Sequence, residues 1–244
     1  KYRPSNFEEV IGQDHVVKAL VNSINSEKIH QAFIFSGTRG VGKTTIARIL
    51  AKCLNCESES KPTAQPCNKC SNTLEISAGR SVDFLEIDAA SNTQVEKMRD
   101  LIETVEYKPA KGRFKVYLID EVHMLSTASF NALLKTLEEP PPHVVFIFAT
   151  TNPEKIPKTV QSRCLQLNLK TVNESLLFEH LKKILDKEKI DSDDTSISLI
   201  VNSAQGSVRD ALTLLDQAIA YGDGVLSEVD VKKLLGTIDN SLLM

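Results

Sequence analysis

Tryptophan is absent from this sequence, only four tyrosines are present, and no apolar run reaches the length of a membrane helix. Such a helix needs roughly 18 to 20 apolar residues, and the first residues also lack the apolar core of a signal peptide. We therefore expect a cytoplasmic protein that does not bind membranes. The few aromatic side chains argue against a stacking series that reads single-stranded nucleic acid. With a net charge of −3, any nucleic-acid binding must depend on local lysines and arginines.

The composition is that of a folded protein, since 41% of the 244 residues are hydrophobic and 25% are charged. This is enough for one large or two modest cores. The sequence begins at Lys1 rather than at Met and stops at Met244 directly after a helical pattern, so we expect a fragment of a longer chain. In a reducing compartment the clustered cysteines indicate metal binding rather than disulfides. Cys164 stands apart from that cluster and is expected to be an ordinary packed thiol.

Short apolar runs alternate with helical patterns through the first two thirds of the chain. Four of the runs are typical of strands, at residues 32–35, 83–87, 115–119 and 144–149, and a weaker fifth lies at 164–168. Strands that alternate with helices predict a parallel α/β sheet. Amphipathic patterns with no strand between them follow at residues 176–190, 196–203, 208–221 and 227–235. We therefore predict a second, all-helical part that begins near Val172.

The strongest chemical signal is a glycine-rich segment between the first strand and a helix over residues 45–54. It fits the pattern G-x-x-x-x-G-K-[ST] with Gly37, Thr38, Arg39, Gly40, Val41, Gly42, Lys43 and Thr44. In this context the pattern predicts a P-loop, whose backbone N–H groups surround a polyphosphate, rather than a simple connecting turn. Lys43 is expected to reach the β and γ oxygens of ATP and Thr44 to bind Mg²⁺. The adjacent Thr45 belongs to the same predicted site.

Hydrolysis requires carboxylates, and the third strand ends in Asp120 and Glu121. A carboxylate at the carboxyl end of a parallel strand lies at the same edge of the sheet as the P-loop. We expect Asp120 to hold the Mg²⁺ and Glu121 to orient or deprotonate the attacking water. Asp88, at the end of the second strand, is an alternative, but it lacks a comparable apolar run and a second adjacent carboxylate. A solvated acidic turn is the other interpretation.

Several segments carry a family resemblance. They are Tyr2, Arg3 and Pro4 with Phe7 and residues 11–13, the P-loop, and residues 120–123, 133–140, 162–164 and 206–212. Together they resemble the tau/gamma subunits of bacterial DNA polymerase III, which are AAA+ ATPases of the clamp loader. The match spans nearly the whole chain, and the intact P-loop distinguishes it from the related delta-prime subunit.

This resemblance implies an α/β AAA+ P-loop NTPase with a five-stranded parallel sheet and a small all-helical lid domain. The nucleotide-binding domain is expected at residues 1–172, with a cysteine-rich, zinc-type insertion at about 53–73. The lid is expected at residues 173–238, and residues 239–244 would begin a linker to a C-terminal collar. The implied function is that of an ATP-driven motor, in which ATP binding and hydrolysis open the sliding clamp and load it onto primer-template DNA.

The implied activity is ATP hydrolysis within a DNA-directed DNA polymerase (nucleotidyltransferase) holoenzyme, of which this chain is not the polymerase. The implied partners are the delta and delta-prime subunits, further copies of the chain, the beta sliding clamp and primer-template DNA. Two alternatives stay open. Another AAA+ DNA machine, such as a branch-migration or recombination-associated ATPase, explains the nucleotide site but not the cysteines and the Ser-Arg-Cys segment together. A non-hydrolysing scaffold subunit is disfavoured by the intact P-loop and carboxylates.

Some residues gain roles only through the resemblance. Thr151, with Thr150 beside it, matches a sensor of the γ-phosphate, and Arg209 matches a second sensor on the lid. Arg163 matches an arginine finger that acts on the ATP of a neighbouring subunit, although alone it reads as a surface arginine that caps a loop. The segment that wraps the adenine would comprise Tyr2, Arg3, Pro4, Val10 and Ile11, which otherwise form a packed strap.

Four cysteines follow the spacing C-x2-C-x10-C-x2-C at Cys53, Cys56, Cys67 and Cys70. This spacing is typical of structural zinc with four ligands. The resemblance supports the last three cysteines but places the fourth ligand at Thr73, whose neutral hydroxyl is a poor ligand for zinc. Three interpretations stay open: Cys53 is the fourth ligand, three thiolates hold zinc weakly, or the loop has lost its metal.

Contacts to DNA are expected on two helices. Lys97 and Arg99 lie early in the helix over residues 95–105, and Lys135 lies in the helix that ends before a run of three prolines. The resemblance places these positions toward the phosphates of a duplex, where contacts are independent of sequence and sensitive to salt. Solvated helix faces are the alternative interpretation.

Overall fold

The computed structural model describes residues 2–91 and 95–241, and within them the side chains outside 95–99 and 237–241. The chain divides into two compact units. The first, here called the N-terminal unit, comprises Lys1–Gly37 and Lys43–Leu169; the second, the C-terminal unit, comprises Thr38–Gly42 and Lys170–Met244. No helix in the described part of the chain is long and apolar enough to cross a membrane.

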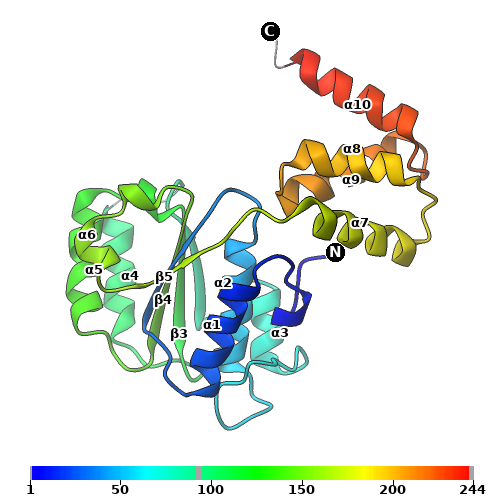
Figure 1. Ribbon diagram of the computed structural model, residues 1–244. Coiled ribbons are helices and arrows are strands. Elements are labelled where there is room, and N and C mark those ends of the chain that lie inside the picture. The colour runs from blue at the N-terminus through cyan, green and yellow to red at the C-terminus, as the bar shows by residue number, and fades with distance from the viewer. Residues whose placement is uncertain (1, 92–94, 242–244) are drawn as a thin grey trace. The chain divides into compact units, whose positions relative to one another are not determined.

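The N-terminal unit is built on one parallel sheet (Figure 1). Its strands are β1 (Ala32–Ser36), β2 (Phe84–Asp88), β3 (Lys115–Asp120), β4 (Val144–Thr150) and β5 (Leu165–Asn168). They lie in the order β2-β3-β4-β1-β5, and every pairing is parallel. The predicted five-stranded parallel sheet is therefore confirmed. The pairing register places Ser36 opposite Thr150 and Asp88 opposite Asp120, so the carboxyl ends of these strands meet at one edge.

Helices cover both faces of the sheet. The N-terminal unit contains η1 (Phe7–Glu9), α1 (Asp14–Asn25), α2 (Lys43–Asn55), α3 (Ser71–Ser77), α4 (Val95–Val105), η2 (Val122–Met124), α5 (Thr127–Glu138), η3 (Pro153–Lys155) and α6 (Lys158–Gln161). Figure 1 shows α4, α5 and α6 on one face and α1, α2 and α3 on the other. This arrangement buries the central strands on both sides, which is why they read as continuous apolar runs.

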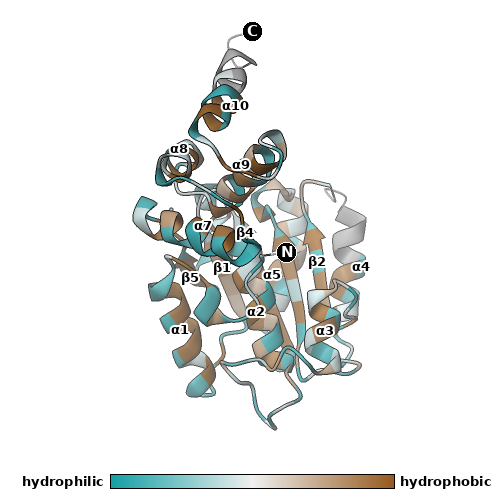
Figure 2. Cartoon of the chain, turned by 90° about the vertical axis from the view of Figure 1, so that its right-hand side faces the viewer, coloured by the Kyte–Doolittle hydropathy of each residue, from teal (hydrophilic) through white to brown (hydrophobic). Residues whose placement is uncertain are grey.

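Three aromatic side chains pack together on the face of the sheet that α4, α5 and α6 cover. Tyr117 stacks on Phe146 with ring centroids 5.4 Å apart, and Phe146 stacks on Phe148 at 6.0 Å. All three are fully buried, as are the alternate residues of β3 and β4 that face the opposite side. The edge strands β2 and β5 are partly exposed. Figure 2 shows that the strands are mostly apolar, whereas apolar and polar residues alternate along the helices.

The described residues of the C-terminal unit form the helices α7 (Glu174–Glu188), α8 (Asp194–Ala204), α9 (Val208–Tyr221) and α10 (Glu228–Ser241). Side chains of Asn173, Asp193 and Ser207 accept backbone N–H bonds at the first turns of α7, α8 and α9 and so stabilise these helix starts. The described part of this unit has no named strand, as the sequence predicts. Helix α10 continues to Ser241, past the predicted end at 235 and into residues expected to begin a linker.

Replacing Phe146 with Ala is expected to destabilise the N-terminal unit by about 3–5 kcal/mol, because it removes two ring contacts and leaves a cavity between fully packed layers. Chemical denaturation of the purified chain measures the change. Val82→Ala is the control, since Val82 is 56% exposed and its truncation is expected to cost less than about 0.5 kcal/mol. Equal effects of the two substitutions would contradict this account of the core.

Candidate functional site

The candidate site is built at the sheet edge where β1, β3 and β4 end. Gly37 follows β1, and its N–H donates to the carbonyl of Thr150 at 3.2 Å. Its φ is +146°, and a Cβ added there would lie 2.5 Å from the carbonyl oxygen of Leu169. Only glycine fits both the conformation and the space. The start of the predicted P-loop is therefore fixed by a steric constraint of the sheet edge.

Lys43 begins α2, and its Nζ donates to the carbonyl oxygen of Gly37 at 2.8 Å. The residue is only 7% exposed. Burial lowers the pKa of Lys43 from its ordinary value, and the nearby charges of Glu121 and Asp120 oppose that shift. The cation is thus held inside the loop, at the place where the sequence pattern predicts a partner for phosphate oxygens.

Thr44 and Asp120 meet across the sheet edge. Thr44 donates from Oγ1 to Oδ2 of Asp120 at 2.8 Å, and Asp120 Oδ1 accepts the N–H of Glu121 at 2.9 Å. A hydroxyl and a carboxylate are hard oxygen donors of the kind that Mg²⁺ prefers, so this pair fits the ion that the fold implies. Asp88 accepts the N–H of Ala90 within its own turn at 2.9 Å. The geometry favours Asp120 over Asp88 for the predicted role.

Glu121 has a left-handed backbone, with φ +47°, which is strained for a residue with a side chain and recurs at functional sites. Its Oε2 accepts the Thr151 hydroxyl at 3.1 Å and the Thr151 N–H at 3.4 Å. His123 Nδ1 lies 3.3 Å from the same oxygen and 2.9 Å from Oγ1 of Thr150. Sequence reasoning assigned no role to His123. Its position shortly after Glu121, at the end of β3, is the signal in the sequence that could have identified it.

The turn Thr38–Gly42, which carries the middle of the predicted P-loop, groups with the C-terminal unit. The carbonyl of Gly40 accepts the N–H of Arg209 at 3.4 Å. A Cβ on Gly40 would lie 2.0 Å from Oγ of Ser207. Arg209 lies in the first turn of α9, and its backbone N–H places it next to the Thr38–Gly42 segment. Thr38, Arg39, Val41 and Gly42 complete the turn, and Thr45 follows Thr44 in α2.

Arg163 follows the short helix α6 and is paired within its own chain. Its Nη2 lies 2.6 Å from Oε1 of Glu138, and its Nη1 donates to the carbonyl of Thr159 at 2.6 Å. About a third of the Arg163 side chain and half of the Glu138 side chain are exposed. An exposed pair of this kind contributes little stability, so its loss on binding another group costs little.

The other predicted site residues are spread over the N-terminal unit. Tyr2, Arg3 and Pro4 precede η1, and Val10 and Ile11 follow it; Arg3 is exposed and the other four are half-buried. Lys135 is exposed on α5. The side chains of Lys97 and Arg99 lie outside the described residues.

The cysteine-rich insertion brings three sulfurs together. The Sγ atoms of Cys56, Cys67 and Cys70 all lie within 4.8 Å of one another, and Cys53 is not in that group. Cys53 is fully buried, with its sulfur 3.7 Å from the carbonyl of Ala64, and burial raises the pKa of its thiol. N–H bonds from Lys69 and then Cys70 lower the pKa of Cys67 to about 6. The structure therefore does not complete the four-ligand zinc site that the spacing predicts.

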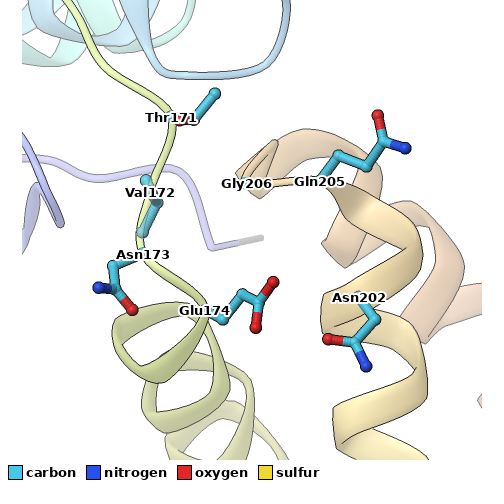
Figure 3. Close-up of a pocket in the computed structure, with 7 residues that line it drawn as sticks. All are labelled: Thr171, Val172, Asn173, Glu174, Asn202, Gln205 and Gly206. Atoms are coloured by element: carbon cyan, nitrogen blue, oxygen red, sulfur yellow. The ribbon is translucent and has the colours of Figure 1, made fainter.

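A separate hollow of about 560 Å³ lies in the C-terminal unit. It is lined by Thr171, Val172, Asn173, Glu174, Asn202, Gln205 and Gly206. Figure 3 shows Glu174 and Asn202 on opposite sides, one at the start of α7 and the other near the end of α8. These described lining residues include none that the sequence assigns to a site. The hollow is polar and open to solvent.

Comparison with known proteins decides the family. A family model described as DNA polymerase III, delta subunit, matches residues 12–173, and one described as the ATPase lid domain of the DNA polymerase III clamp loader subunit matches residues 177–224. The DNA polymerase III subunit tau of Escherichia coli is 57% identical over 240 residues. The chain belongs to the tau/gamma family of DNA polymerase III clamp-loader subunits. The resemblance found in the sequence is confirmed.

The relatives in this family are longer than the chain. The match to the E. coli protein covers 98% of the chain and 37% of that protein. The match to the tau subunit of Bacillus subtilis, at 45% identity, covers 97% of the chain and 42% of that protein. The chain thus spans less than half the length of these two members of the tau/gamma family.

Solved structures establish the fold class. The RuvB Holliday junction branch migration motor of Thermotoga maritima matches with a TM-score of 0.71 at 20% identity, covering 97% of the chain and 72% of that structure. At this identity the likeness concerns the fold alone. The fold is that of an AAA+ P-loop ATPase, which implies a nucleotide and Mg²⁺.

Gly37→Ala is expected to lower the free energy of unfolding by at least about 2 kcal/mol, because the new Cβ meets both a forbidden backbone region and the Leu169 carbonyl. Gly79→Ala is the matched control. Gly79 has φ +66° but open space around its Cβ position, so its cost is about 1 kcal/mol from the backbone alone. Denaturant titration of both variants measures the difference. Equal losses would show that the sheet edge does not constrain Gly37.

Proposed function

We propose that this chain is the ATP-hydrolysing motor subunit of a bacterial DNA polymerase III clamp loader, acting in the cytoplasm. The observation that carries the proposal is the contact between Thr44 and Asp120 at 2.8 Å, beside a buried Lys43. These side chains supply the cation and the hard oxygen donors that a nucleotide and Mg²⁺ require. Membership of the clamp-loader family supports the same conclusion.

In this proposal residues 1–172 bind the nucleotide and residues 173–238 form the lid. Bound ATP supplies the phosphoryl group that is transferred to water. Lys43 would bind the terminal phosphate oxygens of ATP, Thr44 and Asp120 would hold Mg²⁺, and Glu121 would accept the proton of the attacking water. Thr151 contacts Glu121 directly, which supports a role for Thr151 in linking the carboxylate to the state of the γ-phosphate.

The arrangement supports coupling between nucleotide and lid. The backbone N–H of Arg209, at the start of α9, donates to the Gly40 carbonyl, which supports coupling between the proposed phosphate-binding turn and the lid. We infer that ATP binding favours an assembly that opens the beta clamp and holds primer-template DNA, and that hydrolysis removes the contacts that favour it. Delta, delta-prime and further copies of the chain complete the assembly. Lys97, Arg99 and Lys135 are the proposed contacts to duplex phosphates.

Two substitutions separate nucleotide binding from hydrolysis. Lys43→Ala removes the buried cation and is expected to abolish ATP binding, whereas Glu121→Gln keeps the shape of the side chain but not its basicity. The second variant is expected to bind ATP normally and to hydrolyse it at least about 100-fold more slowly. Binding of a fluorescent ATP analogue and release of phosphate measure the two properties. Full hydrolysis by either variant in the assembled loader would refute the assignment.

The proposed arginine finger is tested in trans. In a loader assembled with delta, delta-prime, clamp and primed DNA, Arg163→Ala is expected to reduce ATP hydrolysis by roughly 10³-fold while each chain still binds ATP, because the guanidinium acts on a neighbour's phosphates. Glu138→Ala is the matched control, since it removes the intrachain partner of Arg163 but keeps the arginine. A wild-type rate that does not respond to clamp and DNA would instead favour another AAA+ DNA machine.

A further inference from the structure

Thr151 supplies donors to the carboxylate of Glu121, but it does not fix the orientation of that carboxylate by itself. The Thr151 hydroxyl has one hydrogen and two acceptors within reach, Oε2 of Glu121 at 3.1 Å and Oδ1 of Asn152 at 2.9 Å. The amide of Asn152 is held in this orientation because its Nδ2 donates to Glu154 at 3.1 Å. The N–H of Thr151 reaches Glu121 only at 3.4 Å. A further donor is therefore required to hold the carboxylate in one orientation.

The imidazole ring of His123 lies beside the same carboxylate oxygen. Nδ1 is 3.3 Å from Oε2 of Glu121 and 2.9 Å from Oγ1 of Thr150. An ionised carboxylate only accepts hydrogen bonds, so an Nδ1 without a hydrogen would present its lone pair to that oxygen. The hydrogen is therefore on Nδ1, which donates to Thr150 and attracts Glu121. The His123 side chain is 9% exposed, so water competes little for this hydrogen.

The position of the ring is set by the fold. His123 lies in η2, which directly follows Glu121, and the buried Val122 anchors this turn in the core. Thr150 is the last residue of β4 and is fully buried, and its Oγ1 also accepts the N–H of Asn152 at 3.0 Å. The contacts thus run from the end of β4 through the hydroxyl of Thr150 and the ring of His123 to the partly exposed carboxylate of Glu121.

From these contacts we propose that His123 is a positioning residue for ATP hydrolysis, oriented by Thr150 and acting through Glu121. Its Nδ1–H holds Oε2 while Glu121 takes one proton from the attacking water, whose oxygen bonds to the γ-phosphorus as the bond to ADP breaks. His123 itself neither gains nor loses a proton. The contact of 3.3 Å is longer than an ordinary hydrogen bond, and such contacts often shorten when substrate is bound. This inference rests on the proposed function, because it requires Glu121 to be the base.

Steady-state ATP hydrolysis by the assembled loader tests this role. His123→Leu removes the donor and is expected to lower kcat by roughly 10- to 100-fold while the Kd of a fluorescent ATP analogue changes by less than about twofold, because Glu121 loses its orientation but the phosphate-binding residues remain. His123→Asn places an N–H close to the position of Nδ1 and is expected to recover at least about one third of the wild-type kcat. A wild-type kcat in His123→Leu, or no recovery in His123→Asn, would overturn the proposal.

His143→Leu is the matched control. His143 precedes the other end of β4, where its Nε2 lies 3.3 Å from the carbonyl of Val105 and 3.2 Å from that of Tyr107. The same substitution there is expected to leave kcat within about twofold of the wild type. A loss of kcat in His143→Leu equal to that in His123→Leu would show that the effect comes from packing in general and would contradict a specific role for His123.

A double variant separates this proposal from the assignment of Glu121. If His123 acts through Glu121, the combination of His123→Leu with Glu121→Gln is expected to hydrolyse ATP within about twofold of Glu121→Gln alone, since the base is already lost. Losses that multiply would show that His123 acts elsewhere. Full hydrolysis by Glu121→Gln would refute the proposed function, whereas slow hydrolysis by Glu121→Gln with a normal rate in His123→Leu would refute only the role of His123.

Nitrogen NMR tests the position of the hydrogen in the wild-type chain. The sequence has five histidines, so selective isotope labelling of histidine leaves few signals, and the signal of His123 is the one lost in His123→Asn. Nδ1 of His123 is expected to carry hydrogen, and Thr150→Val is expected to shift its resonance because the ring loses its anchor. An Nδ1 without hydrogen, or a resonance that Thr150→Val leaves unchanged, would overturn the proposed arrangement.

Discussion

Parallel pairing of β1, β3 and β4 is the constraint on which the rest of the structure depends. Because all three strands run the same way and are buried on both faces, their carboxyl ends must meet at one edge. Residues separated by 76 positions, Thr44 and Asp120, thereby come within 2.8 Å. The predicted phosphate-binding turn, the carboxylates and the Thr150–Thr151 pair lie at one edge of the sheet because of that alignment.

The described bonds at this edge form a network around Glu121. Its strained backbone aims the carboxylate at the end of β4, where Thr151 and His123 meet it. Strain of this kind persists only when surrounding contacts over-determine it. Here the buried strands β3 and β4 provide that support, so the fold holds a conformation that an isolated turn would abandon.

Much of the fold could be predicted from the periodicity of apolar residues. The features that the sequence did not predict were missed for separate physical reasons. The apolar runs of β1, β3 and β4 were plain because both faces are buried, and β5 was weak because three of its four residues are exposed. Helix α1 was not anticipated, although its buried residues Val16, Leu20 and Ile24 follow the four-residue spacing of a helix face; its start has no side-chain cap, because Gln13 makes no such bond. The contacts of His123 and the absence of Cys53 from the group of three sulfurs depend on tertiary packing, which residue spacing in a sequence does not encode.

Lys43 illustrates how such a site shapes the energetics of the whole unit. Its ammonium is desolvated and bonded to the Gly37 carbonyl. In the proposed site a phosphate oxygen would bind a charge that folding has already removed from water, so the cost of desolvating this lysine lowers the stability of the fold rather than the affinity for the ligand. The unit is accordingly less stable than an equivalent with an apolar side chain at this position, a compromise between folding and function at a single residue.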